Sequence, residues 1–115
     1  GRFLKLMSGG EPLTITGDGK QTRDFVHVRD VVTALITSAE SENVGKGEVV
    51  NIGTGCETSV NELADLFGGE KIYISARVEP RSSCADIKKA KKLLNWEPKV
   101  SLKNGIAELK KEFGL

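Results

Sequence analysis

The sequence predicts a mixed α/β fold in a single domain. Its length, 115 residues, normally accommodates one domain and no more. Residues that cap helices occur at four places, and each is followed by apolar residues at helical spacing. Between these places lie short segments rich in β-branched residues and bounded by glycine turns, a pattern typical of strands. Helices and short strands are therefore expected to alternate along the chain.

The first forty residues contain two expected helices and two expected strands. Residues 3–8 predict the last turns of a helix, which Gly9-Gly10 closes. Residues 13–16 and 22–28 predict short strands on either side of a glycine turn. A helix is expected over residues 30–42, with Asp30 as its N-cap.

The remainder of the chain predicts two more strands and three more helices. Strands are expected over 48–52 and 71–75, each next to glycines that turn the chain. Ser59 and Glu62 have the spacing of a capping box, which starts a helix over 59–67. Asp86 and Ser101 are expected to cap helices over 86–94 and 101–113, and Trp96 is expected to anchor the last helix.

Composition excludes several classes of function. Basic residues number 17 and acidic residues 16, so the net charge of +1 indicates no polyanionic partner. The lysines at 88, 89, 91 and 92 alternate with apolar residues, which favours a solvated helix face over a nucleic-acid patch. His27 is the only histidine, so a site that needs two is excluded, and we interpret it as a packed or surface residue. The two cysteines fit a reduced, intracellular protein.

The core is expected to be incomplete. Hydrophobic residues make up 38% of the chain, below the roughly 45–50% of an average domain. The chain also begins inside an expected helix, without an initiating Met or a signal peptide, which suggests truncation or processing. We therefore expect another domain or another copy of the chain to supply the missing contacts.

Several segments together resemble the extended short-chain dehydrogenase/reductases, the family that contains UDP-glucose 4-epimerase and related nucleotide-sugar epimerases and dehydratases. The order and spacing of these segments over nearly the whole chain carry the resemblance. They are Gly17-Asp18-Gly19-Lys20-Gln21-Thr22-Arg23-Asp24-Phe25-Val26-His27-Val28 with Asp30-Val31-Val32, then Val50-Asn51-Ile52-Gly53-Thr54-Gly55, Ser59-Val60-Asn61-Glu62-Leu63, Ala85-Asp86-Ile87-Lys88-Lys89-Ala90, and Leu94-Asn95-Trp96-Glu97-Pro98.

The resemblance implies that residues 1–115 are the small C-terminal lobe that binds the nucleotide sugar. In the family, an N-terminal Rossmann domain binds NAD through a glycine-rich turn and carries a Tyr-x-x-x-Lys pair. This chain has no such turn, and Arg77 stands four residues after its only tyrosine, Tyr73. The Rossmann domain is therefore expected to be absent, no NAD is expected to bind, and the chain alone is expected to be inactive.

The resemblance also implies a set of substrate-binding residues. Arg23 is expected to face the substrate phosphates, since a guanidinium meets two phosphate oxygens at once. Phe25 stands where the family often has an aromatic near the nucleotide, although burial is an equal interpretation. The family commonly has Arg-x-Gly-Asp or Arg-x-Gly-Glu on phosphate and ribose, and here Arg77-Val78-Glu79 lacks the glycine. Arg81 is a second candidate phosphate ligand.

The expected function is thus the binding of a UDP-sugar or related nucleotide sugar within an NAD-dependent epimerase or dehydratase. A cytoplasmic location is expected, with no nucleic-acid or membrane partner. The chain could pair with a separate Rossmann half or form a homo-oligomer through the helix after Asp30 or the 48–52 strand. Two alternatives remain open, a stand-alone binding or oligomerisation module and a non-functional fragment of the lobe.

Overall fold

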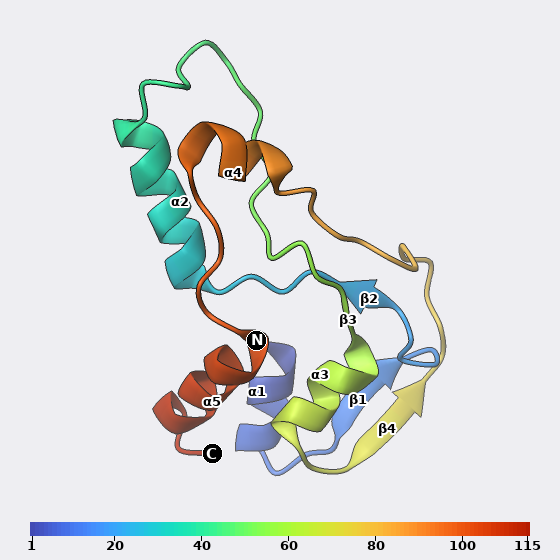
Figure 1. Cartoon of the computed structure of the whole chain (residues 1–115). Coiled ribbons are helices and arrows are strands. Elements are labelled where there is room, and N and C mark those ends of the chain that lie inside the picture. Colours follow the sequence, from blue (N-terminus) through green and yellow to red (C-terminus); the bar gives the residue numbers. More distant parts are fainter.

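The computed structural model describes all 115 residues and confirms a mixed α/β fold (Figure 1). Five helices and four short strands follow one another along the chain. They are α1 (Arg2–Ser8), β1 (Leu13–Thr16), β2 (Thr22–Arg23), α2 (Val28–Glu40), β3 (Thr58–Ser59), α3 (Val60–Phe67), β4 (Lys71–Ile74), α4 (Lys88–Leu94) and α5 (Leu102–Glu112). No helix is long and apolar enough to cross a membrane.

The strands form two small sheets. β1 and β4 pair in parallel, with Leu13 beside Lys71 and Thr16 beside Ile74. β2 and β3 pair antiparallel over two residues each. The capping box predicted at Ser59 is confirmed, so α3 begins directly after β3. Ser101 is confirmed as the N-cap of α5, where its hydroxyl accepts a hydrogen bond from the backbone N–H of Asn104.

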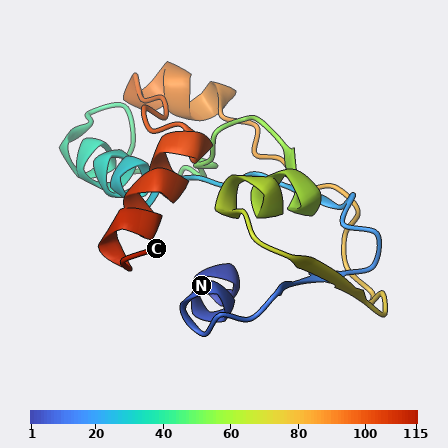
Figure 2. The ribbon, with the colours of Figure 1, turned by 90° about the horizontal axis from the view of Figure 1, so that it is seen from below.

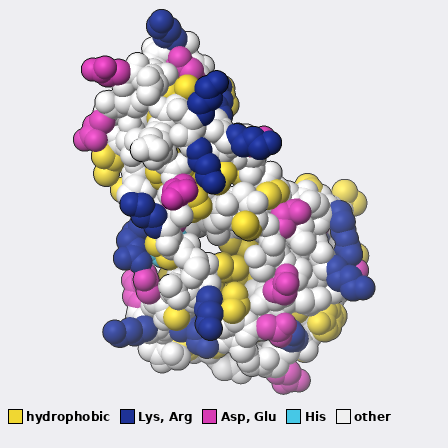
Figure 3. All heavy atoms as spheres, viewed as in Figure 1, with side chains coloured by type: hydrophobic (Ala, Val, Ile, Leu, Met, Phe, Trp, Pro, Cys, Tyr) yellow, Lys and Arg dark blue, Asp and Glu magenta, His cyan; other side chains and the backbone are white.

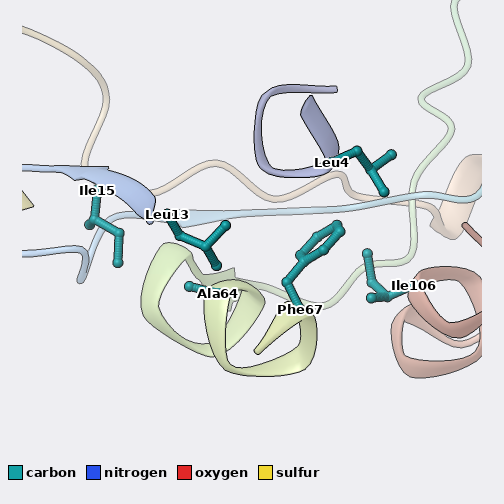
Figure 4. Close-up of a cluster of buried hydrophobic side chains, with 6 residues drawn as sticks. All are labelled: Leu4, Leu13, Ile15, Ala64, Phe67 and Ile106. Atoms are coloured by element: carbon teal, nitrogen blue, oxygen red, sulfur yellow. The ribbon is translucent and has the colours of Figure 1, made fainter. Parts of the chain in front are cut away.

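The apolar side chains form two separate cores. The larger core lies where α1, β1, α3 and α5 meet, and Figure 4 shows its six buried side chains converging from these elements. Seen from below, α1 lies on one side of this core and α3 with α5 on the other (Figure 2). The six residues are Leu4, Leu13, Ile15, Ala64, Phe67 and Ile106.

The smaller core joins α2 to α4 and contains Ala34, Ala90, Leu94 and Trp96. The Trp96 indole N–H also donates a hydrogen bond of 3.1 Å to the Thr33 hydroxyl. Trp96 therefore anchors α4 against α2, and the prediction that it anchors the last helix is wrong. The four lysines of α4 are exposed as predicted, and basic side chains stand out over this upper part of the molecule in Figure 3.

Asp30 does not cap α2, contrary to the prediction. The helix begins two residues earlier, and the ring nitrogen Nδ1 of His27 caps it by accepting from the Arg29 backbone N–H. The Asp30 carboxylate is buried and accepts hydrogen bonds of 3.1 and 3.0 Å from the backbone N–H groups of Lys99 and Val100. Asp30 therefore ties the start of α2 to the segment that leads from the smaller core to α5.

Two predicted strands are wrong in whole or in part. The 48–52 segment is irregular, because no strand of this chain lies beside it to complete a ladder. Its Val50 and Ile52 side chains pack instead against the smaller core. The strand predicted over 22–28 stops at Arg23, where the antiparallel partner β3 also ends.

The molecule is flat and exposes more surface than a compact domain of its mass. Its extents are 48 × 33 × 17 Å and its radius of gyration is 16.4 Å, whereas about 13 Å is expected for a compact chain of this length. The accessible surface is 7661 Å², against about 6,100 Å² for a compact monomer of equal mass. This excess bears out the expectation of an incomplete core.

Replacing Asp30 by Asn is expected to lower the free energy of unfolding by about 1.5–3 kcal/mol, since the amide can face only one of the two backbone N–H groups as an acceptor. Urea unfolding followed by circular dichroism would measure this. Asp86→Asn is the matched control, because Asp86 is exposed and accepts one hydrogen bond, from the Lys88 N–H. Equal losses in the two variants would contradict the role assigned to Asp30.

Candidate functional site

An open hollow of about 330 Å³ lies where the C-terminal ends of β1 and β4 meet the segment after β4. Seven of its eight lining residues are not hydrophobic, and most have charged or hydrogen-bonding side chains. The lining residues are Thr16, Gly17, Asp18, Gln21, Ala76, Arg77, Glu79 and Arg81. The predicted site residues Arg77, Glu79 and Arg81 are thus brought together in one place.

Glu79 forms ion pairs with two of the predicted arginines. Its Oε2 atom lies 2.9 Å from Nη2 of Arg23, and its Oε1 atom lies 3.7 Å from Nε of Arg77. The Arg23 guanidinium also donates to the Thr22 carbonyl at 2.6 Å, which holds it along β2. The segment lacks the glycine that the family has between its Arg and its acidic residue, but Arg77 and Glu79 still contact each other. Arg23 also contacts Glu79, which lies 56 residues further along the sequence.

Arg81 is held by a different carboxylate at the edge of the same hollow. Its two terminal nitrogens donate to the two Asp18 oxygens at 2.8 and 3.0 Å, in a fork. The hydrogen bond from Arg81 lowers the pKa of Asp18 to about 2, with a further contribution from the Lys20 N–H. Asp18 sits in the glycine turn that follows β1, so this turn positions Arg81.

Gln21 was not predicted as a site residue, although it lies inside the segment that carried the resemblance. Its side chain is buried, and its amide nitrogen donates to the Thr16 carbonyl at 2.9 Å and to Glu79 at 3.4 Å. Gln21 therefore helps to orient the Glu79 carboxylate through this hydrogen bond. The only signal in the sequence is its position two residues before Arg23.

Phe25 lies outside this hollow. It lines a separate apolar hollow of about 240 Å³, together with residues of α1, α3 and α5. Because β2 ends at Arg23, the chain leaves the sheet before Phe25 and carries this ring to the larger core. His27 lines the same apolar hollow.

Asp24 organises the loops next to the arginines. Its carboxylate accepts from the Thr54 N–H at 2.8 Å and hydroxyl at 2.5 Å, from the Gly55 N–H at 2.9 Å and from the Ala85 N–H at 3.2 Å. Desolvation raises the pKa of Asp24, but these hydrogen bonds outweigh it, and the net pKa is lowered. Asp24 is therefore held as a carboxylate that fixes two loops.

The geometry can bind an anion. Two guanidinium groups and two carboxylates line the hollow, and the Arg23 guanidinium, paired with Glu79, brings the net charge of these five side chains to +1; the lining contains no histidine, cysteine or tyrosine. No group of three or more His, Cys, Asp or Glu residues could hold a metal ion.

Comparison with known proteins agrees with the resemblance seen in the sequence. The family model described as GDP-mannose 4,6 dehydratase matches residues 3–109. UDP-glucuronic acid decarboxylase 2 of Arabidopsis thaliana is 43% identical over 111 residues, which are 90% of this chain and 24% of the relative. The chain spans 24–36% of the length of the curated relatives it matches.

Solved structures give the same picture. UDP-glucose 4-epimerase from Thermotoga maritima, solved with UDP-glucose, has a TM-score of 0.84 and 42% identity, over 97% of this chain and 37% of that one. UDP-glucuronic acid 4-epimerase from Bacillus cereus, in complex with UDP-glucuronic acid and NAD, has a TM-score of 0.89 and 32% identity, over 98% and 38%.

Asp24→Asn is expected to destabilise the chain in a pH-dependent way. The folded pKa lies below the ordinary 3.8, so the ionised carboxylate stabilises the fold above about pH 5, and this is lost as the pH falls below about 4. At pH 7 the variant should lose about 1–3 kcal/mol in the free energy of unfolding. The difference from the wild type should shrink between about pH 5 and pH 3.

Acid and urea unfolding of both chains, followed by circular dichroism, would test this expectation. Glu42→Gln is the control, because Glu42 is exposed and its side chain has no hydrogen-bond or ion-pair partner in the structure. A difference between Asp24→Asn and the wild type that stays constant down to pH 3 would contradict the assignment.

Proposed function

This chain belongs to the family of NAD-dependent nucleotide-sugar epimerases and dehydratases that the GDP-mannose 4,6 dehydratase model describes, and we propose that it is the nucleotide-sugar-binding part of such an enzyme. One observation carries the proposal. Arg77 and Arg81 line one open, polar hollow, and Arg23, from a distant part of the sequence, is paired with the lining residue Glu79.

The diphosphate of a nucleotide sugar suits this cluster. Guanidinium groups bind phosphate oxygens in pairs, and charge-assisted hydrogen bonds of this kind are about twice as strong as neutral ones. Carboxylates hold all three arginines in place before any ligand arrives, which reduces the ordering cost of binding. The arginines outnumber those carboxylates, so a diphosphate meets a site of net positive charge.

We propose that the Glu79 carboxylate accepts a hydrogen bond from a ribose hydroxyl in addition to its contacts with the arginines. A carboxylate has about four acceptor positions, and Glu79 uses them for Arg23, Gln21 and the weaker contact with Arg77. One position is left for a ribose hydroxyl. Phe25 is not part of the proposed site, because it lines the apolar hollow instead.

A UDP-sugar is the favoured ligand. The names of the matched relatives and structures are dominated by UDP-glucose, UDP-glucuronic acid and their epimerases or decarboxylases. The hollow, at about 330 Å³, is at the lower end of the range for ligand pockets. It therefore accommodates part of such a ligand, and the other contacts would come from the remainder of a complete enzyme.

The residues of this chain do not fit NAD. A dinucleotide cradle needs a parallel strand, a glycine-rich turn and a helix N-terminus aimed at the pyrophosphate. After β1 the glycine turn leads to another strand, and after β4 the chain is irregular as far as α4. The one helix that starts directly after a strand is α3. At its N-terminus the Glu62 carboxylate already accepts a hydrogen bond from the Ser59 backbone N–H. We propose that this chain binds no NAD and is not catalytic alone.

We propose that the outer face of α2 contacts either the cofactor domain of a complete enzyme or another copy of the chain. Its apolar side chains at Val28, Val32, Leu35 and Ile36 are 46–68% exposed, and α5 does not cover them. The accessible surface in excess of a compact monomer is about 1,500 Å², the size of a large interface between domains. The cofactor domain of a complete enzyme would supply this cover.

Replacing Arg23 by Ala is expected to weaken UDP binding at low salt about 10- to 150-fold, the equivalent of about 1.5–3 kcal/mol. Arg23→Lys should also bind more weakly than the wild type, because an ammonium cannot form the fork. Isothermal titration calorimetry measures both, and NAD injected into the same protein should show no binding tighter than about 1 mM.

Arg29→Ala is the matched control, because Arg29 is an exposed arginine paired with Glu108 on α5, away from the hollow. Thermal melting of each variant confirms that folding is retained. The assignment fails if Arg23→Ala and Arg29→Ala bind UDP equally well.

The chain alone is expected to form a dimer or larger oligomer at high micromolar concentration, because α2 exposes its apolar face. Leu35→Glu should return it to a 12.4 kDa monomer in sedimentation equilibrium, since a charge at the centre of that face is costly to bury. Phe113→Glu, at an apolar residue after α5 that is also more than half exposed, should leave association unchanged. A wild-type chain that stays monomeric would refute self-association through this face.

A further inference from the structure

The two cysteines of the chain lie on neighbouring loop segments next to the arginine hollow. Cys56 belongs to the loop before β3 and Cys84 to the irregular segment before α4. Both are free and exposed. They are 28 positions apart in the sequence, so their proximity comes from the fold and not from the chain between them.

Two sets of contacts fix how these segments are aligned. The Asp24 Oδ2 atom accepts from the backbone N–H groups of both Gly55 and Ala85. Further along, the Ser82 hydroxyl donates to the Glu57 carboxylate. Residue 55 thus lies near residue 85 and residue 57 near residue 82, so the two segments run in opposite directions and Cys56 and Cys84 lie on them between these contacts.

The spacing of the segments suits a disulfide bond. The Gly55 and Ala85 nitrogens lie 2.9 and 3.2 Å from one and the same oxygen, so they are within about 6 Å of each other. Each of these nitrogens belongs to the residue next to a cysteine. Disulfide-bonded cysteines have Cα atoms about 4.4–6.8 Å apart. We propose that Cys56 and Cys84 form a reversible disulfide bond that fastens the segment after β4 to the loop before β3.

The bond can form by thiol–disulfide exchange with a small disulfide such as oxidised glutathione. The thiolate of one cysteine attacks the small disulfide, forms a mixed disulfide and releases one glutathione thiolate. The thiolate of the other cysteine then attacks the protein sulfur of that mixed disulfide and releases the second glutathione. Two protein thiols are oxidised, one glutathione disulfide is reduced, and the two thiol protons end on the released glutathione molecules.

The local charges determine the conditions for the reaction. Desolvation and the negative charges of Asp24, Glu57 and Asp86, together with Cys56, raise the pKa of Cys84. Since the thiolate is the reacting form, oxidation should be faster at pH 8.5 than at pH 7. The bond would close a covalent loop over residues 56–84, which contains Arg77, Glu79 and Arg81.

The test is to incubate the reduced 115-residue chain with oxidised glutathione at pH 8.5 and to measure intact mass and free thiols. We expect loss of both thiols, no retained glutathione and a peptide map that links Cys56 to Cys84 within a monomer. The midpoint of thermal unfolding of the oxidised chain should rise by roughly 5–10 °C, and dithiothreitol should reverse the change.

Cys56→Ser and Cys84→Ser are the matched controls, and each should retain one glutathione as a stable mixed disulfide. Wild-type chains that retain two glutathione molecules, or that link only between molecules, would overturn the proposal. The crosslink is independent of ligand binding, so a chain that forms it but does not bind UDP would refute only the proposed function.

Discussion

The arrangement of the site depends on the hydrogen bonds that the Asp24 carboxylate accepts. This carboxylate holds the 53–55 loop and the segment around Ala85 against the end of β2. The packing is so close that a Cβ atom at Gly53 would lie 2.6 Å from an Asp24 oxygen and 2.5 Å from the Ala85 side chain. Only glycine fits there, so backbone N–H groups can reach the carboxylate and replace the water that it loses.

The arginine hollow follows from this arrangement. The segment after β4 has no regular secondary structure of its own, so its path is set by its attachments at Asp24 and Asp18 and by the backbone bond from Thr22 to the Arg81 carbonyl. Those attachments place Arg77, Glu79 and Arg81 opposite Arg23. Positive charge is thereby concentrated at the ends of two parallel strands, where open α/β sheets usually bind their ligands.

Sequence patterns predicted the helices well because their signals are local. Ser59 and Ser101 cap α3 and α5 as expected, since a capping hydroxyl needs only the next three residues. Strands need a partner, and the 48–52 segment has none within this chain. Asp30 has the chemistry of a cap but finds two donors 69 and 70 residues away. Such long-range contacts, like the one between Arg23 and Glu79, leave no mark in the local pattern.

The division of the interior into two cores has a consequence for local unfolding. The α2–α4 core rests on four buried residues, and its buried polar link to the rest of the molecule is the carboxylate of Asp30. Regions with few buried contacts open with a smaller free energy than the whole molecule. Amide hydrogens in the middle of α2 and α4 should therefore exchange with solvent by local opening of the smaller core. Those of β1 and α3 should exchange only when the larger core opens.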